Sequence, residues 1–367
     1  MKLVFSSFPD LADNALVVLA AYLGTNHKGK CYYLYSNKTD LNDLQSKAQL
    51  YLGVHATQVR FVKKKSLLGV YHYLTAQFAF ETHGMFEQLP KLPWQTKVNL
   101  WHGMPLKKIG YASDEHTKLN MDYTLATAPV FAPIIANVFA IADSKVLHIG
   151  EPRNDLFYHG PQFSFANIFN NDWPTIVWLP TYRQSQTGGV HYDSPQTKGT
   201  IGGLKLADLK QMQTSLSKHG FNLAIKLHPM DVLNKQPLKL NAPNIHIINN
   251  QEFTSYHIEV NTFLKASTAL ITDYSSVYFD YVLLQRPIGI LALDQNAYQH
   301  NRGFVSEQVR TQMHGHQINN INDFSNFLTA VAQAELGYDP QVAMQFFDKY
   351  DTHGHNSVTL LRQIGLI

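Results

Sequence analysis

The sequence predicts an α/β protein built from two parallel sheets with helices on their faces. Short runs rich in β-branched and aromatic residues alternate with longer helical patterns, and this alternation occurs in two successive series. The length of 367 residues also favours two domains, because single hydrophobic cores stop growing at roughly 250 to 300 residues. Hydrophobic residues make up 45% of the chain and charged residues only 16%, so the composition is that of a folded protein and not of a disordered one.

The first series of expected strands occupies residues 2–5, 31–35, 59–62, 78–81, 98–101 and 146–149. Helical patterns such as 14–23 and 130–140 lie between them. The second series occupies residues 175–179, 223–227, 245–248, 269–272 and 288–293. The segment 160–172 contains Gly, Pro, Asn and Asp, and we expect the domain boundary there. The prediction is therefore two Rossmann-like domains, residues 1–162 and 163–344, with a C-terminal helix at about 345–367 that packs back on the first. The glycine-enriched segment 188–203 is expected to be a mobile loop.

The charge balance and the cysteine content exclude several classes of protein. Thirty basic and 27 acidic side chains give a net charge of +3, which is too balanced for a general polyanion binder, so no nucleic-acid partner is expected. Cys31 is the only cysteine, so an intrachain disulfide is impossible and a reducing compartment is expected. No export signal is expected from the first residues, and the apolar run 15–23 is shorter than the roughly 20 residues that cross a bilayer.

Polar residues collect directly after the expected strands, where open parallel sheets bind their ligands. In the first series these residues are His102, Gly103, Lys107, Arg153 and Asp155, and in the second they are Thr181, Arg183, His228, Asp273, Ser275, Ser276 and Asp294. We therefore expect several strand ends to face one cleft and to form a ligand site.

Ser275 and Ser276 precede the apolar-periodic segment 277–284, so they are expected at the start of a helix. Free N–H groups and the positive end of the helix dipole suit a phosphate there. An ordinary helix cap is the simpler explanation for an isolated Asp-x-Ser sequence. His228 and Arg183 at neighbouring strand ends favour phosphate binding, because a guanidinium can donate two parallel hydrogen bonds to phosphate oxygens.

Other nucleotide and metal motifs are absent from the sequence. Neither a Gly-x-Gly-x-x-Gly fingerprint after the first strand nor a Walker lysine loop occurs, so NAD enzymes and P-loop NTPases are not expected. The His-Gly-His sequences at 314–316 and 353–355 lack a nearby carboxylate and are expected to be loop histidines. The basic cluster formed by Arg60 and 63–65 precedes the apolar run 67–80; a solvated turn before a core helix is the favoured interpretation, and a membrane-contact patch is the alternative.

Five motifs occur in a fixed order along the chain. They are WHGMPLKKIG at 101–110, IGEPRND at 149–155, LPTYR at 179–183, KLHP at 226–229 and ITDYSSVYFD at 271–280. Together they resemble the CDP-glycerol glycerophosphotransferase family of teichoic acid synthesis. Arg286-Pro287, Asp294, Tyr298 and 302–304 continue the match, which is dense over about 95–305. Met104 stands where the family usually has threonine, and the sequence after 302–304 lacks the aromatic-acidic pattern of the polymerases, so the acceptor and the polyol stay open.

The resemblance implies a GT-B-like fold whose two domains face a central cleft, with the donor held mainly by the second. It implies transfer of glycerol phosphate or ribitol phosphate from CDP-glycerol or CDP-ribitol to an undecaprenyl-diphosphate-linked acceptor or a polyol phosphate chain. CMP is released, and such enzymes are peripheral on the cytoplasmic face of the membrane. The residue types suit this reaction independently of the resemblance. A neutral imidazole can take the proton of an attacking hydroxyl, and cationic donors can stabilise the phosphoryl charge.

By this resemblance each site residue receives an expected role. His102 is the base, and His228 donates to the pyrophosphate. The donor is bound by Thr181, Arg183, Asp273, Ser275, Ser276, Asp280 and Arg302, and the acceptor side or cleft is lined by Gly103, Lys107, Arg153 and Asp155. The residues require no cofactor, although a divalent cation stays open, as do primase or polymerase activity and the oligomeric state. The alternatives are another GT-B enzyme that uses a UDP-sugar, either a glycosyltransferase or an epimerase, and a non-catalytic scaffold of envelope assembly.

Overall fold

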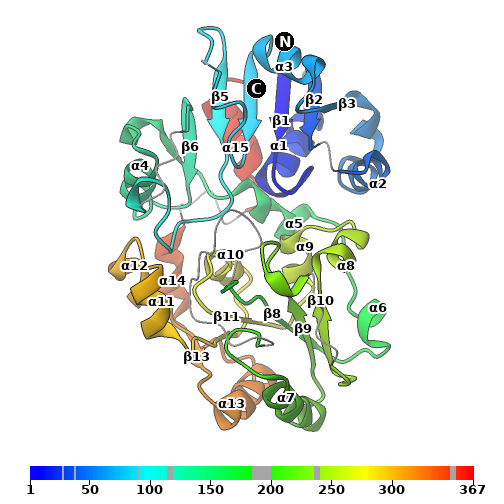
Figure 1. Ribbon diagram of the computed structural model, residues 1–367, viewed down its shortest axis with the longest axis vertical. Coiled ribbons are helices and arrows are strands. Elements are labelled where there is room, and N and C mark those ends of the chain that lie inside the picture. The colour runs from blue at the N-terminus through cyan, green and yellow to red at the C-terminus, as the bar shows by residue number, and fades with distance from the viewer. Residues whose placement is uncertain are drawn as a thin grey trace.

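The computed structural model describes residues 1–26, 29–36, 39–89, 91–113, 119–183, 200–234, 240–347 and 353–367. Within these residues the chain forms two sheets, and every strand pair in both of them is parallel (Figure 1). The α/β class predicted from the sequence is confirmed. Most of the expected glycine-enriched loop at 188–203 lies outside the described residues.

The first sheet has the order β3-β2-β1-β4-β5-β6-β7. Its strands are β1 (Lys2–Ser6), β2 (Lys30–Tyr35), β3 (Val59–Lys63), β4 (Phe78–Glu81), β5 (Thr96–Asn99), β6 (Tyr123–Ala126) and β7 (Val146–His148). The helices of this half are α1 (Asp13–Leu23), α2 (Leu41–Leu52), α3 (Leu67–Leu74) and α4 (Ala132–Phe139), followed by the short α5 (Leu156–His159) and α6 (Ala166–Phe169). Short 3-10 turns occur at Gly53–Gln58, Gly110–Ala112, Asp143–Lys145 and Pro152–Asp155.

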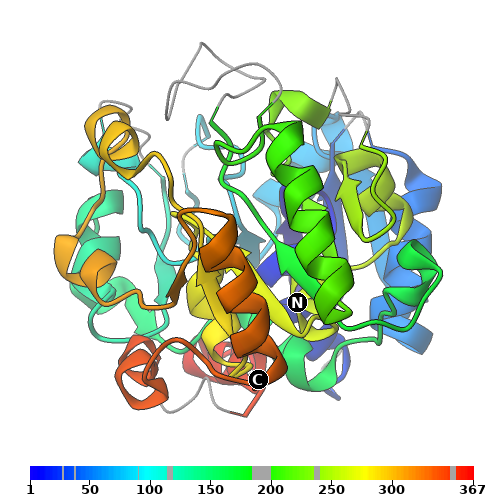
Figure 2. The ribbon, with the colours of Figure 1, turned by 90° about the horizontal axis from the view of Figure 1, so that it is seen from below.

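The second sheet has the order β10-β9-β8-β11-β12-β13. Its strands are β8 (Thr175–Trp178), β9 (Asn222–Lys226), β10 (Ile245–Ile248), β11 (Ala269–Thr272), β12 (Ile288–Ile290) and β13 (His316–Gln317). The helices are α7 (Leu206–His219), α8 (Asn250–Ser255), α9 (Val260–Lys265), α10 (Val277–Val282), α11 (Gln295–Asn301), α12 (Glu307–Thr311), α13 (Ile321–Ala332), α14 (Pro340–Ala343) and α15 (Asn356–Gln363). Figure 2 shows α7 (green) and α13 (orange) side by side in front of this sheet. His316 lies in β13 and not in a loop, which corrects the sequence-based expectation.

The strand expected at 98–101 is observed two residues earlier, as β5 (Thr96–Asn99). The side chain of Asn99 accepts a hydrogen bond from the backbone N–H of Trp101 (2.9 Å), and Trp101 has a left-handed φ of 50°. This local turn ends the strand before Trp101. Strands β6 and β13 were not predicted, and β13 has only two residues, too few to show a strand period.

The two halves of the molecule share an apolar core. Side chains before and after the expected boundary belong to one buried cluster, which includes Met104, Phe131, Phe263, Tyr278 and Phe279. The ring of Phe131, next to α4, meets that of Phe279, in α10, at 5.0 Å between centroids and 75° between planes. Because this interface is packed, it fixes how the carboxyl ends of the two sets of strands face each other.

Helix α15 packs on the first half although it follows the second in sequence (Figure 1). Leu360 and Leu361 are fully buried, and they belong to the same core cluster as Leu3 and Phe5 of β1 and Leu16 of α1. All strands of the second sheet lie between β7 and α15 in the chain.

Candidate active site

His102 lies in the turn that follows β5. Its Nδ1 is 3.4 Å from the backbone carbonyl oxygen of Thr82, and its ring stacks on His83 at 4.0 Å with only 3° between the planes. Because a carbonyl can only accept, this contact favours the tautomer that carries its proton on Nδ1 and its lone pair on Nε2. Burial and the neighbouring His83 hold the pKa of His102 well below its usual value. The ring is therefore neutral near pH 7 and has a basic nitrogen available.

His228 follows β9 and has the opposite tautomer. The backbone N–H of Met230 donates to its Nδ1 (3.1 Å), so the neutral ring carries its proton on Nε2. Asp231 and Asn234 donate to the His228 carbonyl oxygen, which anchors the loop. Burial, together with the positive charges of Lys107 and Lys226, holds the pKa of His228 well below its usual value. His228 is thus a neutral N–H donor.

Lys107, from the first half of the chain, contacts Tyr182 of the second half. Its Nζ lies over the ring of Tyr182, 4.8 Å from the centroid, and the Tyr182 ring is 4.6 Å from that of His228. The charge of Lys107 also contributes to the lowered pKa of His102. We call His102, Lys107, Tyr182 and His228 the cleft group. The first two come from the first half of the chain and the last two from the second.

A short backbone pairing holds Lys107 in this place. Lys107 forms an antiparallel bridge with Phe304, and Val305 N–H donates to the Leu106 carbonyl oxygen (3.0 Å). Lys108 N–H donates to the carbonyl oxygen of Gly303 (3.2 Å). Arg302 directly precedes this pairing; its side chain is half-buried, and its backbone N–H donates to the Tyr298 carbonyl oxygen.

The His102 turn also touches the start of α10. Gly103 has a φ of 131°, and a Cβ built on it would lie 2.6 Å from the Ser276 Oγ. A side chain at this position would therefore meet Ser276 and would strain the backbone. Ser276 occupies the position before α10, and Ser275 Oγ accepts from the Val277 N–H (3.4 Å). The structure thus brings Ser276 beside Gly103, next to His102, and the shared site expected for these residues stays a prediction.

Arg183 differs from the expected phosphate ligand. Its Nε and Nη2 donate to the two carboxylate oxygens of Asp294 (2.7 and 3.0 Å), and its Nη1 contacts Asp273 Oδ2 (2.9 Å) and the Thr181 carbonyl oxygen (2.7 Å). The side chain is almost fully buried. Thr181 in turn donates through its N–H and hydroxyl to Asp273. Protein acceptors occupy these donors, so Arg183, Thr181 and Asp273 form a clamp that holds the loops after β8, β11 and β12 together.

Arg153 and Asp280 pair with each other instead of lining an open surface. Arg153 Nη2 donates to Asp280 Oδ2 (2.8 Å), and Nη1 donates to Asp13 Oδ1 (3.2 Å) and to the His102 carbonyl oxygen (2.7 Å). Both Arg153 and Asp280 are buried. The expected donor-binding role of Asp280 is therefore corrected, because its carboxylate lies in a buried ion pair between the two halves.

Asp155 is also not in the cleft. Its two carboxylate oxygens accept from the backbone N–H groups of Asn356 and Ser357 (both 2.9 Å), at the start of α15. Burial raises the pKa of this carboxyl group above its usual value, although these hydrogen bonds oppose the rise. Asp155 therefore attaches α15 to the first half, which corrects its expected place on the acceptor side.

Three residues around the His102 turn were not expected from the sequence: Thr82, His83 and Asp13. Thr82 and His83 directly follow β4, a strand that was predicted at its observed position, 78–81. Their position after a predicted strand could have identified both as candidate site residues. Asp13 gave no signal, because only the fold brings it to Arg153, 140 positions away.

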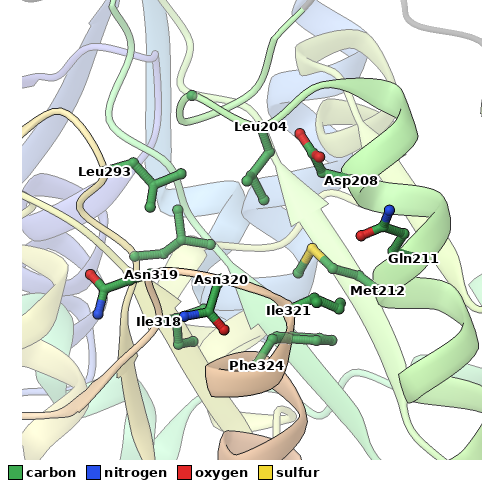
Figure 3. Close-up of a pocket in the computed structure, with 12 residues that line it drawn as sticks. Leu204, Asp208, Gln211, Met212, Leu293, Ile318, Asn319, Asn320, Ile321 and Phe324 are labelled. Atoms are coloured by element: carbon green, nitrogen blue, oxygen red, sulfur yellow. The ribbon is translucent and has the colours of Figure 1, made fainter.

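A cavity of about 380 Å³ lies apart from the cleft group, on the α7 and α13 side of the second sheet (Figure 3). Leu204, Met212 and Phe324 form part of its apolar lining, and Asp208 and Gln211 of α7 are among its polar side chains. None of the expected site residues lines it.

Across the described ranges, no group of three or more His, Cys, Asp or Glu side chains is arranged to hold a metal ion. In the same part of the chain, no helix has the length and apolar character that crossing a bilayer demands.

Residues 2–364 match the family described as CDP-Glycerol:Poly(glycerophosphate) glycerophosphotransferase. The chain belongs to this family.

Among the curated relatives is the teichoic acid ribitol-phosphate primase of Bacillus spizizenii, 27% identical over 237 residues, which cover 59% of this chain and 56% of the relative. The teichoic acid poly(glycerol phosphate) polymerase of the same organism is 26% identical over 275 residues, or 68% of this chain and 64% of the relative. The matched regions are thus less than two thirds of either relative.

This CDP-glycerol glycerophosphotransferase family member also has a solved structural neighbour. The wall teichoic acid polymerase TagF, in a variant soaked with CDPG, superposes with a TM-score of 0.76 over 99% of this chain and 88% of the TagF chain. The sequence identity is 21%, so the likeness is one of fold. The expected GT-B-like arrangement of two parallel sheets is confirmed.

Proposed function

We propose that this protein transfers glycerol phosphate or ribitol phosphate from a CDP-alditol to a hydroxyl group of a lipid-linked acceptor or of a polyol phosphate chain, and releases CMP. Membership of the CDP-glycerol glycerophosphotransferase family supports the donor class. In this proposal residues 1–162 form the acceptor-side domain, with α15 attached to it, and residues 163–344 form the donor-binding domain.

The observation that carries the proposal is the pair of neutral histidines with opposite tautomers. His102 presents a lone pair at Nε2, and His228 presents an N–H at Nε2. Displacement at a phosphoryl centre needs a base for the attacking hydroxyl and a hydrogen-bond donor for the phosphoryl oxygens. Two neutral imidazoles with opposite tautomers can supply both. The charge of Lys107, which lowers the pKa of both histidines, suits the negative charge of a pyrophosphate.

The step follows from these positions. The acceptor hydroxyl oxygen attacks the β-phosphorus, which carries the polyol, while its proton passes to Nε2 of His102. The bond between the β-phosphorus and the bridging oxygen breaks, and the electron pair leaves with CMP. His228 donates its Nε2 proton in a hydrogen bond to the phosphoryl oxygens, and Lys107 balances their charge. Ser276 lies beside Gly103, and with Ser275 before it completes the polar surface that we propose around the reacting phosphate.

We also propose that the protein acts as a peripheral protein at the cytoplasmic face of the membrane, through the surface of α3. Leu67, Leu68 and Tyr71 are 92%, 62% and 56% exposed, and lie on neighbouring turns of this helix. The side chains of Lys63 and Lys65, just before the helix, are exposed as well. Figure 1 shows α3 at the end of the molecule opposite α7 and α13. Apolar side chains beside several cations suit an anionic bilayer.

Incubation of the purified protein with CDP-glycerol, CDP-ribitol or a UDP-sugar and a synthetic lipid-linked disaccharide tests the proposal. We expect CMP and an acceptor heavier by one or more polyol phosphate units in mass spectrometry. Release of UDP with transfer or epimerisation of the sugar would replace the proposal with the GT-B alternative. No turnover of any donor by folded protein would favour a scaffold.

A further inference from the structure

The turn that carries His102 has an unusual backbone. Trp101 and Gly103, on either side of His102, have φ values of 50° and 131°, in the region that side chains rarely adopt. Such a turn persists only when its surroundings hold it in place. Its position therefore depends on the groups that bind its backbone.

Three successive carbonyl oxygens of this turn accept hydrogen bonds from buried side chains. The Asn14 amide donates to the carbonyl oxygens of Leu100 (2.9 Å) and Trp101 (3.2 Å). Arg153 Nη1 donates to that of His102 (2.7 Å). The side-chain oxygen of Asn14 accepts from the backbone N–H of Arg153 (2.8 Å), so the two anchors also hold each other.

Arg153 is the anchor that reaches both halves of the molecule. Besides the His102 carbonyl, its guanidinium pairs with Asp13 of α1 and with Asp280 of α10. Helix α10 begins directly after Ser276, which lies against Gly103. One side chain thus connects the His102 turn with the helix that borders the donor side.

We propose that Arg153 is a positioning residue, which aligns His102 with the donor by binding the His102 carbonyl oxygen and Asp280 at the same time. The inference rests on the proposed role of His102 but not on the identity of the polyol. A lysine would keep the charge, but its ammonium group is a single point and cannot reproduce the planar fork that contacts three partners.

Arg153→Lys tests the proposal, with Arg286→Lys as the matched control. Arg286 also donates to two backbone carbonyl oxygens, those of Lys265 and Ser267, but belongs to the second half and does not contact the cleft group. We expect Arg153→Lys to lower kcat at least tenfold, while KM for CDP-glycerol changes less than threefold. Arg286→Lys should keep kcat per folded molecule. An unchanged kcat in folded Arg153→Lys, or equal losses in both variants, would overturn the proposal.

A second measurement does not depend on turnover. The charged or titratable groups that act on His102 are His83, Arg153 and Lys107, and each of them lowers its pKa, as does burial. In NMR titrations with labelled histidine, we expect the His102 pKa to rise in both Arg153→Lys and Asp280→Asn, because the turn loosens and water reaches the ring. An identical His102 titration in wild type and both variants would refute the coupling. Absence of turnover with every CDP-alditol, together with a shifted titration, would refute only the proposed function.

Discussion

Replacement of His102 by alanine is the most direct test of the catalytic arrangement. The change removes the Nε2 lone pair but leaves His228, Lys107 and the serines before α10 in place. General base catalysis contributes about 10²- to 10⁴-fold, which is roughly 3 to 5 kcal/mol of the activation barrier. The orienting contact to the Thr82 carbonyl is long, at 3.4 Å, so the base is held mainly by its stack on His83. We therefore expect a loss near the lower limit, about a hundredfold in kcat.

The assay is CMP release at saturating CDP-glycerol, with KM measured separately. KM should stay within about threefold of wild type, because a base acts in the transition state and not in donor binding. Since the His102 pKa is lowered, wild-type kcat should be flat above about pH 6.5 and fall only in more acidic buffer. The variant should lose this acid limb.

The matched control is His219→Ala. His219 bonds to the Ser215 carbonyl oxygen in α7, away from the cleft group, and its loss should leave kcat unchanged. Near-normal turnover by folded His102→Ala would refute the reasoning. Loss of CDP-glycerol binding would instead move His102 into the donor pocket.

Four further predictions concern other parts of the molecule. His228→Ala should raise KM for the donor about tenfold to a hundredfold, as expected for a hydrogen bond to a charged group, and unchanged donor kinetics would remove it from the site. Arg183→Ala should destabilise the fold by about 3 to 5 kcal/mol in thermal denaturation, because the buried Asp273 and the partly buried Asp294 lose their partner. An unchanged melting temperature would contradict the clamp. Burial raises the pKa of Glu151 to about 7, so its contribution to stability is complete below the unfolded pKa of about 4.5 and is lost as the pH rises through 7. The free energy of unfolding of Glu151→Gln should therefore vary less with pH than that of wild type between pH 5 and 8.5. Parallel stability curves for the two proteins would disprove this. The double variant Leu67→Ser, Leu68→Ser should sediment less with anionic vesicles than wild type. Val54→Ser, which removes another exposed apolar residue, is the control and should sediment like wild type. Equal sedimentation of all three proteins would show that α3 does not contact the membrane.

The sequence predicted the class of fold and most of the strands, because both depend on local pattern. His102 and His228 follow their strands as expected, and the charge of Lys107 lowers the pKa of both. What a given charged residue does at a strand end depends on its partner, and the partner can lie far away in sequence. Arg183 is neutralised by Asp294, 111 positions later, and Asp155 binds the N–H groups of a helix about 200 positions later. No periodicity or motif spacing records such pairs.

The roles of the missed residues follow the same logic. His83 was overlooked although its strand was predicted, since only the parallel order β4 next to β5 places its ring on that of His102. Strand β5 ends before Trp101 because the Asn99 side chain accepts a hydrogen bond from the Trp101 N–H. Strand propensities cannot predict that hydrogen bond.

The place of α15 has a consequence for how the chain folds during synthesis. The core of the first half needs Leu360 and Leu361, but about 200 residues separate Asp155, which caps α15, from that helix. During synthesis, the whole second sheet therefore leaves the ribosome before α15 can complete the core of the first half. Until then, the surface of α1 that α15 covers has no partner, and it is apolar. The first half is thus the one exposed to chaperones and proteases for longer, and we expect it to close last.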